Sequence, residues 1–335
     1  MESKSFQALV VTEKSDGTFA QNIEQRQIQD LPEGEVLVRV DYSSLNYKDA
    51  LSASGNRGVT KKYPHTPGID AVGSVEQSSV GEFKPGDEVV VTGYDLGMNT
   101  TGGFGRYIRI PAAWVMAKPP KLSARACMQI GTAGFTAAQC VLGLQDMGVR
   151  RSQGPVLVTG ATGGVGCVAV ALLRELGYTV VAVTGKEAEH PWLKELGASD
   201  FLTREQATIG ANRMLLRERW AGVVDTVGGS ILATAIKSTK YDGVVTCCGN
   251  AASGDLPLNV YPFILRGLKL VGIDSAQCPM ERRTEIWQKI ADEWDLQFLD
   301  TMSSTVTLAE IGAAIDAMLQ GKIRGRTVID LRENV

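Results

Sequence analysis

The sequence predicts an α/β protein of two domains, an irregular β-barrel followed by a doubly wound parallel sheet. The chain has 335 residues, which corresponds to about two domains of roughly 150 residues each. Short segments rich in β-branched residues, separated by turns, fill residues 1–120. After residue 123, apolar strand-like segments alternate with longer helical ones, a pattern typical of βαβ units.

The predicted barrel strands are bounded by Gly and Pro turns, such as the Lys-Pro-Gly-Asp sequence at 84–87. Asn46 and Tyr47 fall in a predicted loop just after one of these strands. We expect the barrel strands at residues 6–12, 35–42, 71–76, 88–92 and 107–110.

An uncharged stretch between Arg125 and Asp146 is about as long as a membrane span. Three glycines and several polar residues interrupt it, and its apolar residues recur at helical spacing. We therefore predict a buried amphipathic helix here and no membrane segment.

The predicted strands of the second domain are continuous apolar runs, as expected for parallel strands covered on both faces. They lie at residues 155–159, 179–183, 223–227, 243–247 and 268–273. A helix near 309–320 and a strand near 326–331 follow without a further crossover, and we expect them to return to the first domain. The predicted domains are residues 1–128, completed by 280–335, and residues 129–279.

Composition excludes several classes of protein. Lys plus Arg number 34 against 37 Asp plus Glu, for a net charge of −3, so nothing indicates a nucleic acid or an anionic membrane as partner. The six cysteines include no CxxC pair and are expected to be reduced thiols. The first residues lack the pattern of a signal peptide, so we expect a cytoplasmic protein.

A glycine-rich turn at residues 160–166 is the strongest motif. It has the spacing Gly-x-x-Gly-x-x-Gly and lies between an apolar strand and an apolar helical segment. Glycines let a pyrophosphate approach the backbone, and a helix N-terminus favours its negative charge. The turn could be purely structural, but the strand and helix on either side favour a dinucleotide site.

The end of the next strand indicates which dinucleotide is bound. An acidic residue there binds a ribose 2′-hydroxyl, whereas basic residues accommodate a 2′-phosphate. Here Thr184, Gly185 and Lys186 end the strand, and Arg204 is a further candidate. The sequence favours NADPH over NADH. Lys186 could instead be a solvated residue at a helix start, and Glu187 lies next to it.

The sequence offers no set of metal ligands. It contains two histidines, His65 and His190, and no cysteine before Cys127. Zinc sites in proteins use three or four Cys, His or carboxylate ligands. We therefore expect no metal centre.

Several segments carry a family resemblance: residues 43–51 (SSLNYKDAL), 67–70 (PGID), 131–137 (GTAGFTA), 225–228 (DTVG) and 262–266 (PFILR). The chain resembles the medium-chain dehydrogenase/reductase superfamily, in the zinc-independent, quinone-oxidoreductase-like branch that includes the acrylyl-CoA reductases. Where zinc members carry Gly-His-Glu, this sequence has Gly68, Ile69 and Asp70. The resemblance implies a GroES-like barrel domain, a Rossmann domain and a homodimer.

The resemblance also implies the contacts of the cofactor. They are Tyr47 at the nicotinamide, Thr162, Gly163, Gly164 and Val165 at the phosphates, Thr184, Gly185, Lys186 and Arg204 at the 2′-phosphate, and Asn250, Ile264 and Ser275 along the remaining groove. Relatives commonly carry arginine where this chain has Lys186. Because lysine cannot bind a phosphate in the bidentate manner of arginine, the affinity for NADPH is expected to be lower, while the preference for NADPH over NADH should persist.

The implied reaction reduces the C=C bond of a small α,β-unsaturated acyl-CoA, acrylyl-CoA to propionyl-CoA, with hydride from the cofactor. The protein must position the alkene and stabilise the enolate oxygen. Asn46 and Tyr47 are the catalytic candidates, and Tyr47 either donates a proton, holds the nicotinamide carboxamide or only fills space. Asp70 either orders the site or caps a turn.

Two other functions remain open at this point. A quinone is the second candidate substrate, and a non-catalytic NADPH-binding role is the third. A CoA thioester would bring phosphates that need basic partners. The available arginines are Arg266, Arg282, Arg283, Arg324 and Arg326.

Overall fold

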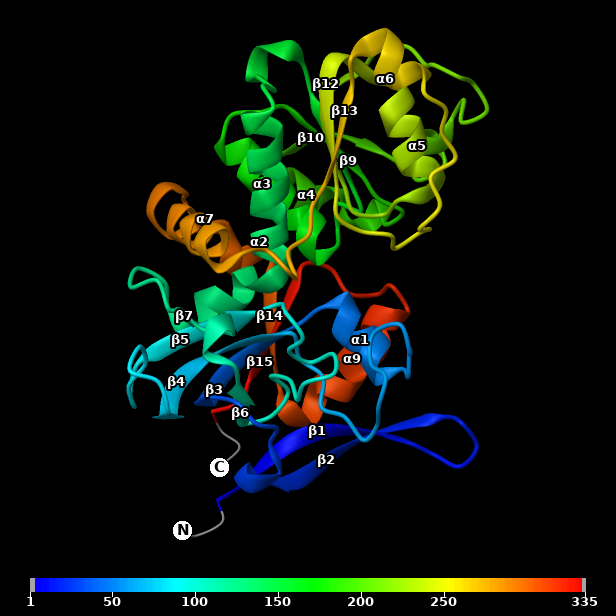
Figure 1. The fold of residues 1–335 in the computed structure, drawn as a ribbon. Helices are drawn as coiled ribbons and strands as arrows, with labels where there is room; N and C mark the ends of the chain where they lie inside the picture. The colour runs from blue at the N-terminus through cyan, green and yellow to red at the C-terminus, as the bar shows by residue number, and fades with distance from the viewer. Residues whose placement is uncertain (1–3, 333–335) are drawn as a thin grey trace. The chain divides into compact units, whose positions relative to one another are not determined.

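The computed structural model describes residues 4–332, and these residues form two compact units (Figure 1). The first unit contains the described residues up to Thr132, together with Ala276–Glu293 and those from Leu299 onward. The second unit contains Ala133–Ser275 and Trp294–Phe298.

The sheet of the first unit is built around the long strand β3, which pairs antiparallel with β4, β6 and β15. Val36, Val38 and Val40 alternate along β3 and are buried in the core of the unit, as the two-residue period of a strand requires. A separate hairpin is formed by β1 and β2. The strands of this unit are β1 (Ser5–Glu13), β2 (Phe19–Gln27), β3 (Val36–Leu45), β4 (Asp70–Ser78), β5 (Glu88–Thr92), β6 (Tyr107–Ile110), β7 (Met116–Ala117), β14 (Ser303–Thr307) and β15 (Arg326–Asp330).

The C-terminal segment forms a parallel crossover. Strand β14 pairs in parallel with β15, and helix α9 (Ile311–Leu319) lies between them in the chain. The prediction of no further crossover in this segment is therefore wrong. The reason is the composition of β14: its sequence, Ser-Ser-Thr-Val-Thr, is polar and mostly half-buried or exposed, so it lacks the apolar pattern that marks the other strands. The partner of β15 on its other side is β3.

Asn46 and Tyr47 lie at the start of helix α1 (Tyr47–Ala53) and not in a loop as predicted. Asn46 is the N-cap residue, and the Asp49 carboxylate, three residues later, accepts its backbone N–H at 2.8 Å. An Asn followed by an acidic residue at this spacing favours the beginning of a helix. The other helices of the first unit include α7 (Met280–Glu293), and α8 (Phe298–Thr301) crosses its boundary.

The second unit is a parallel sheet of six strands in the order β10-β9-β8-β11-β12-β13. Numbered within this unit, the order is 3-2-1-4-5-6, which is that of dinucleotide-binding Rossmann folds. The strands are β8 (Val156–Thr159), β9 (Val180–Val183), β10 (Ala198–Leu202), β11 (Trp220–Asp225), β12 (Thr239–Cys247) and β13 (Lys269–Gly272), and the helices are α3 (Gly164–Glu175), α4 (His190–Leu196), α5 (Gly229–Lys237) and α6 (Tyr261–Arg266). The predicted doubly wound fold is confirmed.

Helix α2 (Ala124–Asp146) contains a break at Gly131, where φ is 50° and ψ is −160°. A Cβ atom at Gly131 would lie 2.5 Å from Asp70 Oδ2, so only glycine fits. Among the described residues, α2 is the one helix long and apolar enough to cross a membrane, and 83% of its most apolar stretch is buried. It is therefore a core helix. The short 3₁₀ turns lie at Ile28–Asp30, Ala112–Trp114, Arg151–Gln153, Glu187–Glu189, Gln206–Thr208 and Leu308–Glu310.

Candidate active site

The glycine turn between β8 and α3 presents a bare backbone at the start of a helix. Gly160 has a φ of +62°, and a Cβ atom there would lie 2.3 Å from Thr226 Oγ1. A Cβ atom at Gly166 would lie 2.3 Å from the carbonyl oxygen of Gly160. Gly163 is exposed between them and Gly164 begins α3. The turn can therefore receive a diphosphate on backbone N–H groups, with the positive end of the helix dipole facing it.

Hydrogen bonds hold the carboxyl ends of β8 and β11 together beside this turn. Thr159 donates its hydroxyl to Asp225 Oδ1 at 2.7 Å and accepts the backbone N–H of Thr226 at 3.0 Å. Asp225 Oδ2 accepts the N–H of Gly228 at 2.8 Å. Burial raises the pKa of the Asp225 carboxyl. The order of strands reverses at this point of the sheet, where doubly wound folds bind their ligands.

Two cations lie close together near the end of β9. The guanidinium of Arg204 lies against Gly185, since a Cβ atom at Gly185 would be 2.8 Å from Arg204 Nε. Burial lowers the pKa of Lys186, and the charge of Arg204 lowers it further, whereas Glu189 raises it. The Lys186 N–H donates to Thr184 Oγ1 at 3.0 Å, which fixes the turn that carries Lys186, whereas Arg204 follows β10. Such a pair suits a group with two negative charges.

The other predicted cofactor residues are more dispersed. The hydroxyls of Thr162 and Thr184 lie 3.4 Å apart, so the structure brings the glycine turn and the end of β9 together. Asn250 is exposed after β12, and Ser275 is half-buried after β13. Ile264 lies on α6 and is 70% exposed. Asp225 and Thr226 were noticed in the sequence only as part of the DTVG motif, although they organise the end of β11.

In the first unit, Asp70 is the centre of a buried polar network. It is 0% exposed. Its carboxylate accepts hydrogen bonds from Ser44 Oγ at 2.6 Å, Asn46 Nδ2 at 2.8 Å and the Thr132 hydroxyl at 2.6 Å. It also accepts the Thr132 N–H at 2.9 Å, where α2 resumes after its break at Gly131. Asp70 thus orders this region and caps a helix segment, the role that its sequence position left open.

Arg326 holds the other side of the same network. Its guanidinium donates to Asn46 Oδ1 at 3.2 Å, to Ser44 Oγ at 2.9 Å and to the Gln129 carbonyl at 3.0 Å. The side-chain amide of Asn46 therefore has partners at both its oxygen and its nitrogen, and the residue is 8% exposed. This arrangement fixes the residue that immediately precedes Tyr47.

Asp49 is a second buried carboxylate at the same helix start. Its Oδ1 accepts the N–H groups of Gly68 and Ile69 at 3.1 and 2.9 Å, and its Oδ2 accepts that of Asn46. Burial raises the pKa of Asp49 to about 7, and the nearby charge of Asp70 adds to this effect, whereas the three N–H donors oppose it. Sequence reasoning overlooked Asp49, although its spacing from Asn46 signals a capping pair.

Tyr47 is the first residue of α1 and is 48% exposed. Within the described part of its own unit, the Tyr47 hydroxyl makes no hydrogen bond. A rigid backbone anchor with an exposed phenol is what a residue needs to meet a bound ligand.

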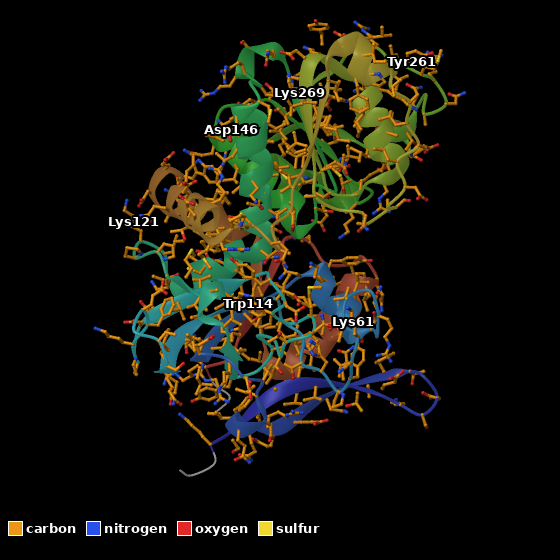
Figure 2. The ribbon with its side chains drawn as sticks, viewed as in Figure 1. Lys61, Trp114, Lys121, Asp146, Tyr261 and Lys269 are labelled. Atoms are coloured by element: carbon orange, nitrogen blue, oxygen red, sulfur yellow. The ribbon has the colours of Figure 1, made fainter. Side chains whose placement is uncertain are left out.

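Tyr94, which sequence reasoning did not single out as a site residue, packs against two side chains. Its φ is +53°, which is uncommon for a residue other than glycine. The Tyr94 ring stacks on that of Trp114, which is labelled in Figure 2, and the two ring centroids are 5.7 Å apart. The Arg283 guanidinium packs on the Tyr94 ring, 4.7 Å from its centroid. The Tyr94 N–H donates to the Ala276 carbonyl at 2.8 Å. This loop is therefore rigidly anchored.

The arginines considered for CoA phosphates are mostly engaged inside the protein. Arg326 and Arg283 are 2% and 1% exposed, and Arg283 donates to Thr92 Oγ1 at 2.9 Å. The expectation that these two are available to a substrate is therefore wrong. Arg266 donates to the carbonyl of Lys237 at 2.7 Å and to that of Thr239, and Arg282 pairs with Glu285 at 3.1 Å. Arg324 lines a cavity.

Potential metal ligands are scattered. Within residues 4–332, no three His, Cys, Asp or Glu side chains lie close enough to hold a metal ion. His65 is buried, its Nε2 lies 2.9 Å from the Gly97 carbonyl oxygen, and burial lowers its pKa. The cysteines are free thiols.

Two family models match the chain in turn. "Alcohol dehydrogenase GroES-like domain" matches residues 32–120, and "Zinc-binding dehydrogenase" matches residues 164–292. The acrylyl-CoA reductase AcuI of Ruegeria pomeroyi is 42% identical over 97% of this chain and 99% of its own length.

Solved structures agree with these matches. Escherichia coli K-12 YhdH with bound NADPH has a TM-score of 0.94 and 43% identity over 97% of this chain and 100% of that one. Bacillus subtilis yhfP with NAD bound has a TM-score of 0.95 and 41% identity over 98% and 100%.

The GroES-like unit and the Rossmann unit with its glycine turn define an oxidoreductase built on a dinucleotide-binding domain. The chain belongs to the medium-chain dehydrogenase/reductase superfamily, in its zinc-independent branch of AcuI and YhdH type. The resemblance seen in the sequence is confirmed. Although one matching model is named for zinc, residues 68–70 of this chain replace the histidine of zinc members with Ile69.

Proposed function

We propose that the protein is an NADPH-dependent, metal-free reductase of acrylyl-CoA, which it converts to propionyl-CoA. The observation that carries this proposal is the 42% identity to the Ruegeria pomeroyi acrylyl-CoA reductase AcuI over 97% of the chain. Such identity over the whole length covers both units, so the binding and reacting parts are shared together.

The described residues fit the cofactor. Gly160 and Gly166 let the turn fold, because a Cβ atom at either would clash with Thr226 or with the Gly160 carbonyl, and the exposed backbone at Gly163 suits a diphosphate. Thr162, Gly163, Gly164 and Val165 would hold that group. Thr184, Gly185, Lys186 and Arg204 would hold the 2′-phosphate, which supports NADPH over NADH, and Asn250, Ile264 and Ser275 would complete the groove.

When bound, NADPH supplies the hydride that is added to the β-carbon of the thioester. Tyr47 orients the nicotinamide through its exposed hydroxyl. Asn46 is a positioning residue. Its side-chain amide forms hydrogen bonds with Asp70 and Arg326, and these bonds fix the backbone that carries Tyr47. A proton must then reach the α-carbon of the substrate, and we assign Tyr47 to positioning of the nicotinamide and not to this transfer.

The test is the identity and labelling of the product. The purified protein, incubated with acrylyl-CoA and NADPH deuterated at the transferred position, should form propionyl-CoA that carries deuterium at its β-carbon. Mass spectrometry and NMR of the product check this. Loss of acrylyl-CoA without propionyl-CoA, or deuterium at the α-carbon, would refute the proposed reaction.

Quinone reduction is the second candidate function. A quinone accepts hydride without a CoA handle, and one relative, of Bacillus subtilis, is named "Putative quinone oxidoreductase YhfP". YhfP is 41% identical over 98% of this chain, close to the 42% of the acrylyl-CoA reductase AcuI, so the assay of both acceptors decides between the two substrates. A non-catalytic NADPH-binding role is the third, and NADPH binding without turnover of any acceptor would support it.

We infer that the protein forms a homodimer through the edge of its Rossmann sheet. Among the described strands, β13 has a neighbour on one side only. Val260, Leu265 and Leu270 on and beside α6 and β13 are 60%, 57% and 37% exposed, and an open edge with apolar side chains favours pairing with a second copy. Light scattering should give a dimer that Leu270→Lys weakens.

We place this activity in the cytoplasm. The thiols are free and four of them are buried, which suits a reducing compartment. Cell fractionation tests this location, and recovery in an exported fraction would contradict it.

A further inference from the structure

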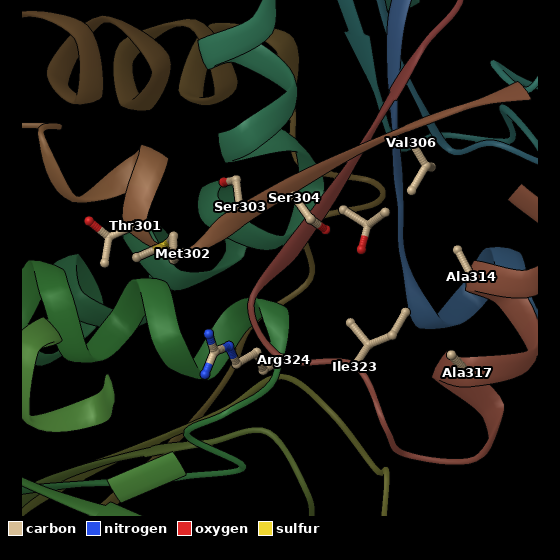
Figure 3. A pocket seen from close by; sticks show the side chains of 10 residues that line it. Thr301, Met302, Ser303, Ser304, Val306, Ala314, Ala317, Ile323 and Arg324 are labelled. Atoms are coloured by element: carbon tan, nitrogen blue, oxygen red, sulfur yellow. The ribbon is translucent and has the colours of Figure 1, made fainter. Parts of the chain in front are cut away.

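A cavity opens beside the crossover of β14, α9 and β15, within the first unit (Figure 3). Its volume is about 380 Å³, which lies in the range of roughly 300–1,000 Å³ typical of small-molecule sites. In Figure 3, the Arg324 side chain lies at the opposite end of the lining from Ala314 and Ala317. The cavity therefore has a cationic end and an end of small apolar side chains.

The lining has the mixed chemistry of a ligand site. Val306, Ala314, Ala317 and Ile323 give apolar walls without bulky side chains, and Ser303 is one of several hydroxyl residues beside them. The Ser303 hydroxyl oxygen is buried and has no hydrogen-bond partner among the described residues. Because an unpaired buried hydroxyl is unfavourable, this group would gain from a hydrogen bond to a ligand atom.

The cavity adjoins the residues that we assign to the reaction. Thr327, which lines it, pairs in register with Leu45, the residue before Asn46. Arg326, next to Thr327, donates to the Asn46 side chain. A ligand in this cavity thus contacts β15, the strand that pairs with β3 next to the Asn46 and Tyr47 helix start.

We propose that this cavity binds the phosphopantetheine arm of the CoA substrate, an inference that rests on the proposed function. The arm is elongated, with two amides and a hydroxyl for the serine and threonine side chains, a dimethyl group for the apolar walls, and a phosphate for Arg324. Arg283 and Arg326 are buried and Arg266 donates to backbone carbonyls. Of the five arginines considered, only Arg324 lines the cavity.

The first test measures the substrate handle separately from the chemistry. Arg324→Gln should raise KM for acrylyl-CoA by about tenfold or more, because a charge-assisted hydrogen bond to phosphate is lost. KM for the acrylyl thioester of N-acetylcysteamine, which lacks the phosphate, and KM for NADPH should stay unchanged. The matched control is Arg282→Gln, an exposed arginine paired with Glu285 on α7, which should leave all three values unchanged.

The second test measures binding without turnover. Calorimetry with pantetheine 4′-phosphate should show binding to the wild type that is lost in Arg324→Gln. It should also weaken in Ala317→Leu, which fills the cavity, and thermal melting checks that this variant folds. Should Ala317→Leu fail to fold, Ser303→Ala serves as the milder change and should also weaken binding.

The two hypotheses fail in different ways. The wild type and both variants, Arg324→Gln and Ala317→Leu, could turn over acrylyl-CoA with the same KM and bind pantetheine 4′-phosphate with the same Kd. This result would overturn the cavity assignment and leave the proposed function standing. Binding of pantetheine 4′-phosphate that depends on Arg324, without turnover of acrylyl-CoA, would support the cavity and overturn the proposed function. Absence of binding to the wild type would overturn the cavity assignment.

Discussion

Arg326 Nη2 lies 3.9 Å from Asp70 Oδ2, and the two side chains are 2% and 0% exposed. They share Ser44 and Asn46 as hydrogen-bond partners. Strand β15, which carries Arg326, thereby fixes the helix start that carries Tyr47. The pair determines the local geometry of the reacting region even though neither charge can reach a substrate.

Removing one member of this pair should destabilise the first unit strongly. Arg326→Met leaves the buried Asp70 carboxylate without its cation, and we expect the free energy of unfolding to fall by about 3–5 kcal/mol. Denaturant unfolding measures this change. The control is Arg332→Met, which breaks a more exposed pair with Asp330 and should cost less than about 1 kcal/mol. Similar losses in both variants would contradict the role given to Arg326.

The ionisation of Asp49 should make stability depend on pH. Its pKa is about 7 in the folded state against an ordinary value of 3.8, so between these pH values the folded state retains a proton that the unfolded state has released. The stabilisation from neutral Asp49 is therefore lost as pH rises toward and through about 7.

Comparison with Asp49→Asn isolates this effect. Burial lowers the pKa of His65, so its titration changes stability with pH in the opposite direction. This contribution is the same in both proteins and cancels in their difference. The unfolding free energy of the wild type minus that of Asp49→Asn should fall by about 2–4 kcal/mol from pH 5 to pH 8. Urea unfolding across this range provides the measurement, with the exposed Asp300→Asn as control. A difference that stays constant with pH would mean that Asp49 is ionised throughout.

Tyr47→Phe distinguishes positioning from proton transfer. Because the Tyr47 side chain is exposed and bonded to no other group of its own unit, we expect a positioning role, with kcat lowered less than about tenfold and KM for NADPH raised. Loss of a general acid would lower kcat by about 10²-fold or more. Steady-state kinetics separate the two, with the exposed Tyr261→Phe as the matched control. A hundredfold loss of kcat at unchanged KM would assign proton donation to Tyr47.

The double variant Lys186→Ala and Arg204→Ala tests cofactor choice. It should raise KM for NADPH by about tenfold or more while KM for NADH changes little, because only NADPH carries the 2′-phosphate. The exposed variant Lys194→Ala on α4 serves as control. Equal increases in KM for NADPH and NADH would show that Lys186 and Arg204 do not bind the 2′-phosphate.

Local patterns in the sequence predict much of this fold. The apolar runs of β8, β9, β11, β12 and β13 and the glycine turn determine the Rossmann unit, because each is complete within a short segment. Strand β14 escaped prediction because Ser and Thr dominate it. The site is harder to predict: Asn46 and Arg326 meet only because β15 pairs with β3, and no local pattern indicates contact between residues so distant in sequence.

Asp49 illustrates an intermediate case. Its spacing from Asn46 is a readable capping signal, yet its burial and its two further N–H donors, Gly68 and Ile69, come from tertiary packing. The same holds for Arg324: its charge is visible in the sequence, but the cavity beside it depends on the crossover of β14 and α9.

The most direct measurement is the rate of NADPH oxidation by the purified protein with acrylyl-CoA, crotonyl-CoA, free acrylate and a simple benzoquinone, repeated with NADH. We predict that acrylyl-CoA with NADPH gives the highest kcat/KM and that free acrylate reacts far more slowly. Rapid turnover of the quinone without activity on either thioester would contradict the proposed substrate, and faster reaction with NADH would contradict the assignment of Lys186 and Arg204.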